Sequence, residues 1–161
     1  MFLWFAGGAV VVVWAVFRDT AIDYRLVALG AVLPDVIDGL WGGARALHSV
    51  VTSVVLLAVV MLATVHRRAA RRRLLALPIG TFLHLVLDGA WGETAVFWWP
   101  LSGWSFDDHR LPSLERGAWS LALEVLGAAA LLWFWRRFDL ADPGRRERFW
   151  RTGRLDRSLA V

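Results

Sequence analysis

The sequence predicts an all-α integral membrane protein, a polytopic helical bundle of four or five spans. Hydrophobic residues make up 58% of the 161 residues and charged residues only 20%, whereas soluble domains carry about 25% charged residues. The mean hydropathy is +0.52, and the apolar residues gather in runs of spanning or near-spanning length. We therefore expect one membrane-embedded helical domain over residues 1–135 and an Arg-rich tail over residues 136–161.

The first two apolar segments are short or interrupted. Residues 2–17 are apolar throughout and end at Arg18. At about 1.5 Å per residue they fall slightly short of a hydrocarbon core about 30 Å thick. No basic residue precedes them, which argues against a signal peptide. Residues 25–42 are less apolar and contain Pro34, so we expect either a short span broken at the proline or a re-entrant segment.

Three further apolar segments complete the predicted bundle. Residues 46–65 form the clearest span, residues 74–91 form another, and residues 118–135 form the last, which contains the acid Glu124. The connection over residues 92–117 is rich in Trp, Pro and Gly, and Trp side chains suit the bilayer interface.

The distribution of arginine predicts the orientation. All 18 Lys and Arg residues are Arg, against 14 acids, and they concentrate in residues 67–73 and in the tail over 136–161. Because basic flanks mark the cytoplasmic ends of membrane helices, we expect both clusters on the cytoplasmic side of the inner membrane. Residues 46–65 then run inward and residues 74–91 outward, which leaves the Trp-rich connection on the outer face.

The same clusters bear on the partners of the protein. Arg side chains could neutralise the phosphates of a nucleic acid. Basic flanks are, however, the ordinary companions of membrane helices, so we expect the lipid bilayer rather than a nucleic acid as the partner.

Five ionisable residues lie within the apolar segments at one predicted membrane depth: Asp35, Asp38, His48, His84 and Asp88. His84 and Asp88 are four residues apart and share a helical face, and Asp35 and Asp38, three apart, do so if their segment is helical. In the predicted topology all five meet near the outer membrane boundary. Burying unpaired ionisable groups is costly, so their joint placement needs a physical explanation.

A divalent metal ion would supply that explanation. The chain has no Cys, so an ion would be held by His and carboxylate groups, a donor set that suits Zn²⁺ or Mn²⁺. An ion with an open coordination position activates water and polarises a carbonyl or phosphoryl oxygen, and a spare carboxylate could act as general base. The alternative also stands: a hydrogen-bonded His–Asp pair on a helix, and Pro-Asp and Asp-Gly dipeptides that are ordinary turn signals.

Other polar residues have simpler interpretations. His66 adjoins an Arg cluster and is typical of a solvated helix end. Glu124 either pairs with an arginine such as Arg116 or faces the site. We expect an exposed turn or the mouth of the site to contain Asp107, Asp108 and His109. We expect helix packing rather than nucleophilic catalysis from Ser49, Thr52 and Ser53.

The ordered set of motifs resembles a known family, the inner-membrane metal-dependent hydrolases, also described as LexA-binding, inner-membrane-associated hydrolases. The motifs are "LPDVID" (33–38), "HS" (48–49), "HLVLD" (84–88) and "WWPLSGWSF" (98–106), within a family-like core over about residues 27–106. The resemblance implies that the five residues above are site positions. Two departures are Gly43, where many members carry a further His, and Asp38, which follows Asp35 by three residues rather than two.

The predicted function is metal-dependent hydrolysis of a lipid-linked or phosphoester substrate that approaches from the outer leaflet. In this hypothesis His48, His84 and Asp88 hold the ion, Asp35 bridges or ligates, and Asp38 orients a ligand or acts as base. One alternative is an ion- or proton-coupled transporter, which would need polar residues toward the cytoplasmic side. The other is a non-catalytic scaffold that binds partners through its basic tail.

Overall fold

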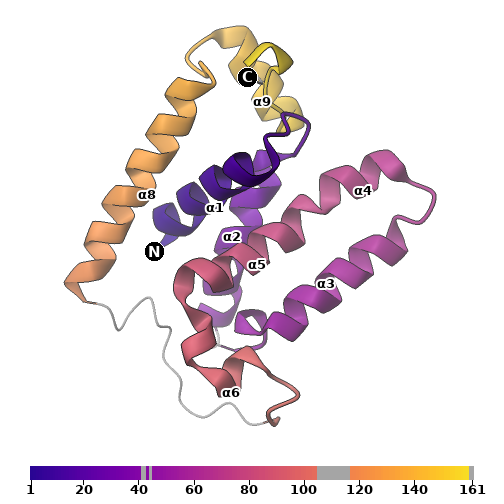
Figure 1. Ribbon diagram of the computed structural model, residues 1–161, viewed down its shortest axis with the longest axis vertical. Coiled ribbons are helices and arrows are strands. Elements are labelled where there is room, and N and C mark those ends of the chain that lie inside the picture. Colours follow the sequence, from indigo (N-terminus) through magenta and orange to yellow (C-terminus); the bar gives the residue numbers. More distant parts are fainter. Residues whose placement is uncertain (41–42, 44, 105–116, 160–161) are drawn as a thin grey trace.

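Every element in the described part of the chain is helical. The computed structural model describes residues 1–40, 43, 45–104 and 117–159, and within these ranges it contains helices and no strand (Figure 1). The all-α prediction is confirmed. In chain order the elements are α1 (Phe2–Phe17), α2 (Tyr24–Gly39), η1 (Ala46–His48), α3 (Val50–Ala63), α4 (Arg68–Leu74), α5 (Ala76–Asp88), η2 (Ala90–Gly92), α6 (Thr94–Phe97), α8 (Ala118–Arg137), α9 (Pro143–Thr152) and η3 (Arg157–Leu159).

Within the described ranges, α8 is the one helix that is long and apolar enough to cross a membrane, by length and composition. The helices α1 and α3 are also apolar but contain 16 and 14 residues. At about 1.5 Å per residue they are about 24 and 21 Å long, shorter than a hydrocarbon core of about 30 Å. Helix length in the described chain therefore does not support the predicted four or five spans.

Helix α2 runs through Pro34 without a break. The predicted interruption or re-entrant turn at this proline is wrong, because the helix is continuous over 16 residues with Pro34 buried inside it. Asp23 caps the N-terminus of α2 by accepting hydrogen bonds from two amides of the first turn. The continuous helix carries Asp35 and Asp38, both buried, on one face three residues apart.

Two glycines bring the backbones of α2 and α5 together. A Cβ atom at Gly30 would overlap the carbonyl oxygen of Leu77, and one at Gly80 would overlap a carbonyl of α2. Side chains at these positions would force the helices apart. The close crossing places the backbone carbonyl of Ala31 in α2 within hydrogen-bonding reach of His84 in α5.

Glu124 of α8 caps the N-terminus of α1. Its Oε2 accepts hydrogen bonds from the amides of Leu3 at 2.8 Å and Trp4 at 3.2 Å. One turn along α8, a Cβ at Gly127 would overlap the backbone of Leu3, so α1 and α8 lie in close contact. This contact gives the acid in the last apolar segment a capping role. The alternative partner, Arg116, lies outside the described residues.

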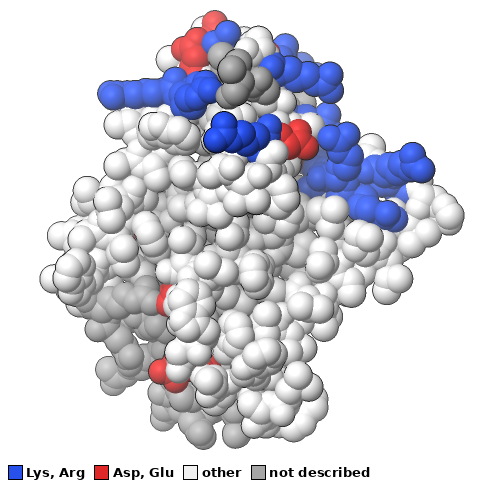
Figure 2. Space-filling model, viewed as in Figure 1, with Lys and Arg blue, Asp and Glu red and all other residues white. Residues whose placement is uncertain are grey.

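Arginines gather at one end of the molecule, where α4 and the C-terminal segment lie (Figures 1 and 2). The C-terminal segment packs against the turn between α1 and α2: the amide of Tyr24 donates to the carbonyl of Gly153 at 2.9 Å. Gly153 has a φ of 71°, and a Cβ there would overlap the Asp23 carboxylate. Arg73 of α4 donates to the same carboxylate at 3.1 Å, so α4 and the tail meet at Asp23.

Candidate metal centre

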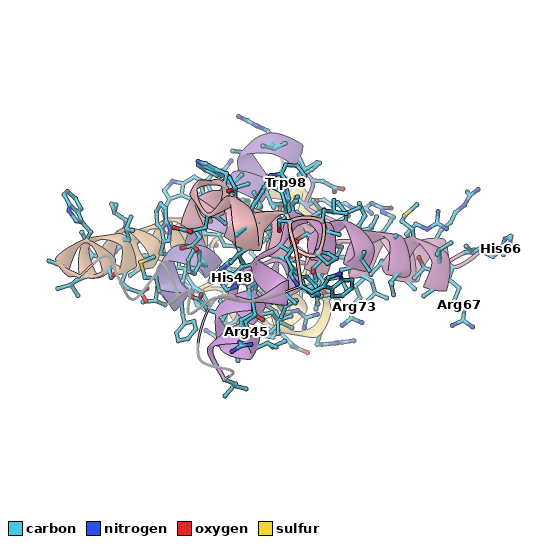
Figure 3. The ribbon with its side chains drawn as sticks, turned by 90° about the horizontal axis from the view of Figure 1, so that it is seen from below. Arg45, His48, His66, Arg67, Arg73 and Trp98 are labelled. Carbon is cyan, nitrogen blue, oxygen red and sulfur yellow. The ribbon has the colours of Figure 1, made fainter. Side chains whose placement is uncertain are left out.

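Three of the five predicted site residues bring their ligand atoms together. Asp35 of α2, His48 of η1 and His84 of α5 are 6%, 2% and 0% exposed, and one ligand atom from each lies within 4.8 Å of the others. Figure 3 shows His48 under the middle of the bundle, whereas His66 and Arg67 lie at its far extremity. His66 is exposed, as expected for a solvated helix end.

The three ligand atoms form a small triangle. The Nε2 atoms of His48 and His84 are 3.3 Å apart, and Oδ1 of Asp35 lies 3.5 Å from the first and 3.7 Å from the second. Ligands around a tetrahedral zinc ion with bonds of about 2.0–2.1 Å are separated by about 3.3–3.4 Å. The observed separations are therefore within a few tenths of an ångström of those that one such ion requires.

Both imidazoles are oriented through their other ring nitrogen. His48 Nδ1 donates to Oδ2 of Asp38 at 2.8 Å, and His84 Nδ1 donates to the carbonyl of Ala31 at 2.8 Å, because a carboxylate and a carbonyl only accept. In neutral rings the two Nε2 lone pairs then face each other. Oδ1 of Asp35 is buried beside them without a hydrogen-bond partner in the described chain. Three acceptors this close require a cation or a shared proton between them.

Asp38 fixes the approach to His48 rather than joining the triangle. In addition to the His48 ring, its Oδ2 accepts hydrogen bonds from the amides of Arg45 at 2.9 Å and Leu47 at 3.0 Å. Gly43 donates its amide to the Asp38 carbonyl at 3.4 Å. One carboxylate thus organises the connection between α2 and η1 and also orients the histidine. Oriented metal-ligating histidines commonly have this kind of carboxylate partner.

Ser49 ties the start of α3 to the Trp-rich segment that follows α5. Its Oγ accepts from the amide of Val51 at 3.1 Å and so caps α3. The hydroxyl lies within donating distance of two carbonyls, that of Phe97 at 3.2 Å and that of Trp99. These contacts occupy Ser49 structurally and argue against a nucleophilic role. Trp98, labelled in Figure 3, lies between Phe97 and Trp99 in the chain and caps the C-terminus of α6.

Asp88 is the last residue of α5, one turn after His84, and is 2% exposed. Its i, i+4 spacing puts both residues on one helical face, as predicted. It does not belong to the group of three converging ligand atoms, and its role as a ligand stays a prediction. Another predicted polar cluster lies outside the described residues: Asp107, Asp108 and His109.

Two groups at the site were not anticipated. The Ala31 carbonyl belongs to no side-chain motif, and only the α2–α5 crossing reveals it. The small residues Gly30 and Gly80 were the available signal for that crossing. The ammonium group of Met1 lies 3.6 Å from Oδ2 of Asp35 and 3.8 Å from Glu124. Positive charge therefore faces the Asp35 oxygen that is not part of the triangle.

No known protein family, curated protein or solved structure matches the chain. The function therefore has to be argued from the residues of the site.

Proposed function

We propose that the chain is a membrane-embedded, metal-dependent hydrolase whose divalent ion is held by Asp35, His48 and His84. The observation that carries the proposal is the triangle of two Nε2 atoms and one carboxylate oxygen, 3.3–3.7 Å apart and buried. The donor set suits Zn²⁺ or Mn²⁺. Support from Asp38 and from the Ala31 carbonyl gives each ring the outer partner that ligating histidines usually have.

The membrane location is proposed from the apolar surface of the molecule. Only Gly127 and Phe134 of α8 are buried, while large apolar side chains such as Leu121, Val125 and Leu132 are exposed. Figure 2 shows a broad surface with few charged side chains below the arginine-rich end. A surface of this kind needs an apolar covering. We propose that lipid provides it, with the arginine-rich end in the cytoplasm and the metal centre toward the outer leaflet.

The multi-pass arrangement needs an adjustment, because α1 and α3 are shorter than the bilayer core. Short apolar helices are accommodated by local thinning of the bilayer and by flanking arginines that extend toward the headgroups. Arg18 after α1 and the arginines after α3 are placed for this. The proposal therefore includes α1, α3 and α8 as crossings toward the arginine-rich end, with α2 and α5 as the crossings that return between them.

The site residues have distinct roles in the proposed reaction. A bound divalent ion supplies Lewis-acid activation of water and of a carbonyl or phosphoryl oxygen. Asp38 orients His48, since its Oδ2 already receives three donors and has little capacity to act as base. Asp88 is proposed as a further ligand or as the base, because it is buried one turn after His84. The substrate class is a lipid-linked or phosphoester compound.

Metal stoichiometry tests this proposal directly. The chain would be purified in detergent without chelators, and zinc and manganese would be measured per chain. We expect one ion in the wild type, loss of that ion in Asp35→Ala, His48→Ala and His84→Ala, and retention in the control His66→Ala. Hydrolysis of bis(p-nitrophenyl) phosphate should be lost in the same three variants.

Two results would overturn the proposal. One is a wild-type protein without a stoichiometric ion. The close approach of the two imidazoles would then be explained by a proton shared between them. The other is a His84→Ala variant that binds as much metal as His66→Ala.

A further inference from the structure

The C-terminal end of α8 carries a shallow, open hollow. Its lining consists of five residues of this one helix: Ala129, Leu132, Trp133, Arg136 and Arg137. They recur at spacings of three and four residues, so they lie on one face of α8. The lining is apolar where it begins and cationic in the last turn of the helix. The hollow therefore changes from apolar to positively charged in a single direction along α8.

The cationic part of the hollow belongs to the arginine-rich end of the molecule. Of the 18 arginines, 15 lie in residues 18–25, 67–73 and 136–157, where there are six acids. Figure 1 shows α8 ending beside α9, and Figure 2 shows arginines gathered at this end above a surface with few charges. On that surface Leu132 and Trp133 are 49% and 45% exposed. The hollow thus lies where the apolar surface meets the excess of positive charge.

The protein itself does not neutralise the two arginines of the hollow. In the part of the chain that the structure describes, the side chains of Arg136 and Arg137 form no salt bridge and no hydrogen bond. The next acid along the chain, Asp139, accepts from Arg145 at 2.6 Å. The guanidinium group of Arg137 lies over the ring of Phe138, 5.5 Å from its centroid, which holds it in place. Two adjacent guanidinium groups without an anion therefore close the apolar hollow.

An anionic phospholipid matches both parts of the lining. Guanidinium groups bind phosphate oxygens through charge-assisted hydrogen bonds, and an acyl chain covers apolar side chains such as Leu132. In the described ranges α8 is also the helix that is long and apolar enough to cross a membrane, and basic residues at the end of such a helix lie at the headgroups. A nucleic acid would meet the arginines but would leave Ala129 and Leu132 in water.

We propose that this hollow binds one anionic phospholipid of the cytoplasmic leaflet, with the phosphate at Arg136 and Arg137 and an acyl chain along Leu132 and Ala129. The inference rests on the proposed membrane location and not on the metal centre. A negatively charged headgroup is preferred to phosphatidylcholine, because the choline ammonium offsets the phosphate charge and is repelled by the guanidinium groups. The lipid is a ligand of the arginine-rich end and not the substrate of the metal centre.

Native mass spectrometry of the full chain in dodecylmaltoside tests the proposal. The protein would be titrated with phosphatidylglycerol or with phosphatidylcholine of the same acyl chains. We expect the wild type to bind one phosphatidylglycerol more tightly than one phosphatidylcholine. The double substitution Arg136→Gln/Arg137→Gln should weaken phosphatidylglycerol binding by about 25-fold, since each arginine near an anionic headgroup contributes about a fivefold gain. Arg136→Gln alone changes an exposed side chain and should weaken it by about fivefold.

A matched double substitution on α4 is the control. Arg67→Gln/Arg68→Gln removes the same charge from two adjacent exposed arginines that do not line the hollow, and it should leave phosphatidylglycerol affinity at the wild-type level. Equal weakening by the two double substitutions would overturn the inference, because the charge of the whole end would then attract the lipid. Binding of a single-stranded oligonucleotide that depends on Arg136 and Arg137, without any preference among lipids, would also overturn it.

Cell fractionation separates this inference from the proposed membrane location. A chain that stays in the membrane fraction until detergent is added, yet binds the two lipids equally, refutes the lipid site alone. A chain recovered in the soluble fraction without detergent refutes the membrane location and the lipid site together.

Discussion

Asp38→Asn is the substitution whose effect the structure predicts in most detail. One oxygen of this carboxylate receives three donors, two backbone amides and the Nδ1 of His48, at 2.8–3.0 Å. Asp38→Ala would leave all three donors without this acceptor, at about 1–3 kcal/mol each. Together these costs, about 3–9 kcal/mol, are a large part of a domain's stability of about 5–15 kcal/mol. Asparagine can keep an acceptor oxygen in place, but it removes the negative charge and puts an NH2 donor where the second carboxylate oxygen was.

Without that charge the His48 ring is a weaker ligand and is held less firmly. Loss of such an outer partner typically lowers metal affinity by about 10–100-fold, which is about 1.4–2.7 kcal/mol. Zinc affinity would be measured by competition with a chromophoric chelator on detergent-purified protein. The control is Asp142→Asn, which changes a capping carboxylate of α9 and should leave zinc affinity unchanged. An Asp38→Asn protein with wild-type zinc affinity would refute the proposed orienting role.

Two further predictions concern the contacts that hold the helices in place. Glu124→Ala removes the acceptor for two amides of α1 and should destabilise the fold by about 1–2 kcal/mol. Thermal unfolding monitored by tryptophan fluorescence would show this as a lower midpoint. The control Glu147→Ala, at an exposed ion pair, should leave the midpoint unchanged. Equal unfolding midpoints for Glu124→Ala and Glu147→Ala would count against the cap. Gly153→Ala introduces a Cβ at positive φ that overlaps Asp23, so trypsin should cleave α9 faster than in wild type. Gly144→Ala, where a Cβ meets only an ordinary contact, should show no change, and equal cleavage of the two variants would contradict the docking of the tail.

The helical class and the two same-face pairs of site residues could be predicted because both depend on local spacing. The i, i+4 relation of His84 to Asp88 and the i, i+3 relation of Asp35 to Asp38 place each pair on one face whatever the tertiary structure. The proximity of Asp35 and His48 follows from the short connection between them. In both cases a few residues of chain settle the geometry.

The tertiary features could not be predicted from spacing. Pro34 indicated a break, yet α2 continues through it, because packing against other helices overrides local propensity. The close crossing at Gly30 and Gly80, which places the Ala31 carbonyl behind His84, depends on residues more than 45 positions apart. Glu124 likewise finds its partners at the other end of the chain. The two glycines show where helices can approach closely, but neither they nor Glu124 show in the sequence which partner they meet.

The spans were overestimated for a related reason. Apolar runs extend through turns: the run over residues 46–65 contains the η1 turn at its start, and its helix α3 has 14 residues. Hydropathy records composition but not where a helix begins. An N-cap such as Ser49, whose hydroxyl accepts from Val51, was the local signal for the shorter helix.

X-ray absorption at the zinc edge of the metal-loaded protein tests the central claim most directly. We predict scattering from two imidazoles and from oxygen ligands at about 2.0–2.2 Å, with one imidazole lost in His84→Ala and both retained in His66→Ala. A spectrum without imidazole scattering, or one that His84→Ala leaves unchanged, would contradict a metal centre at Asp35, His48 and His84.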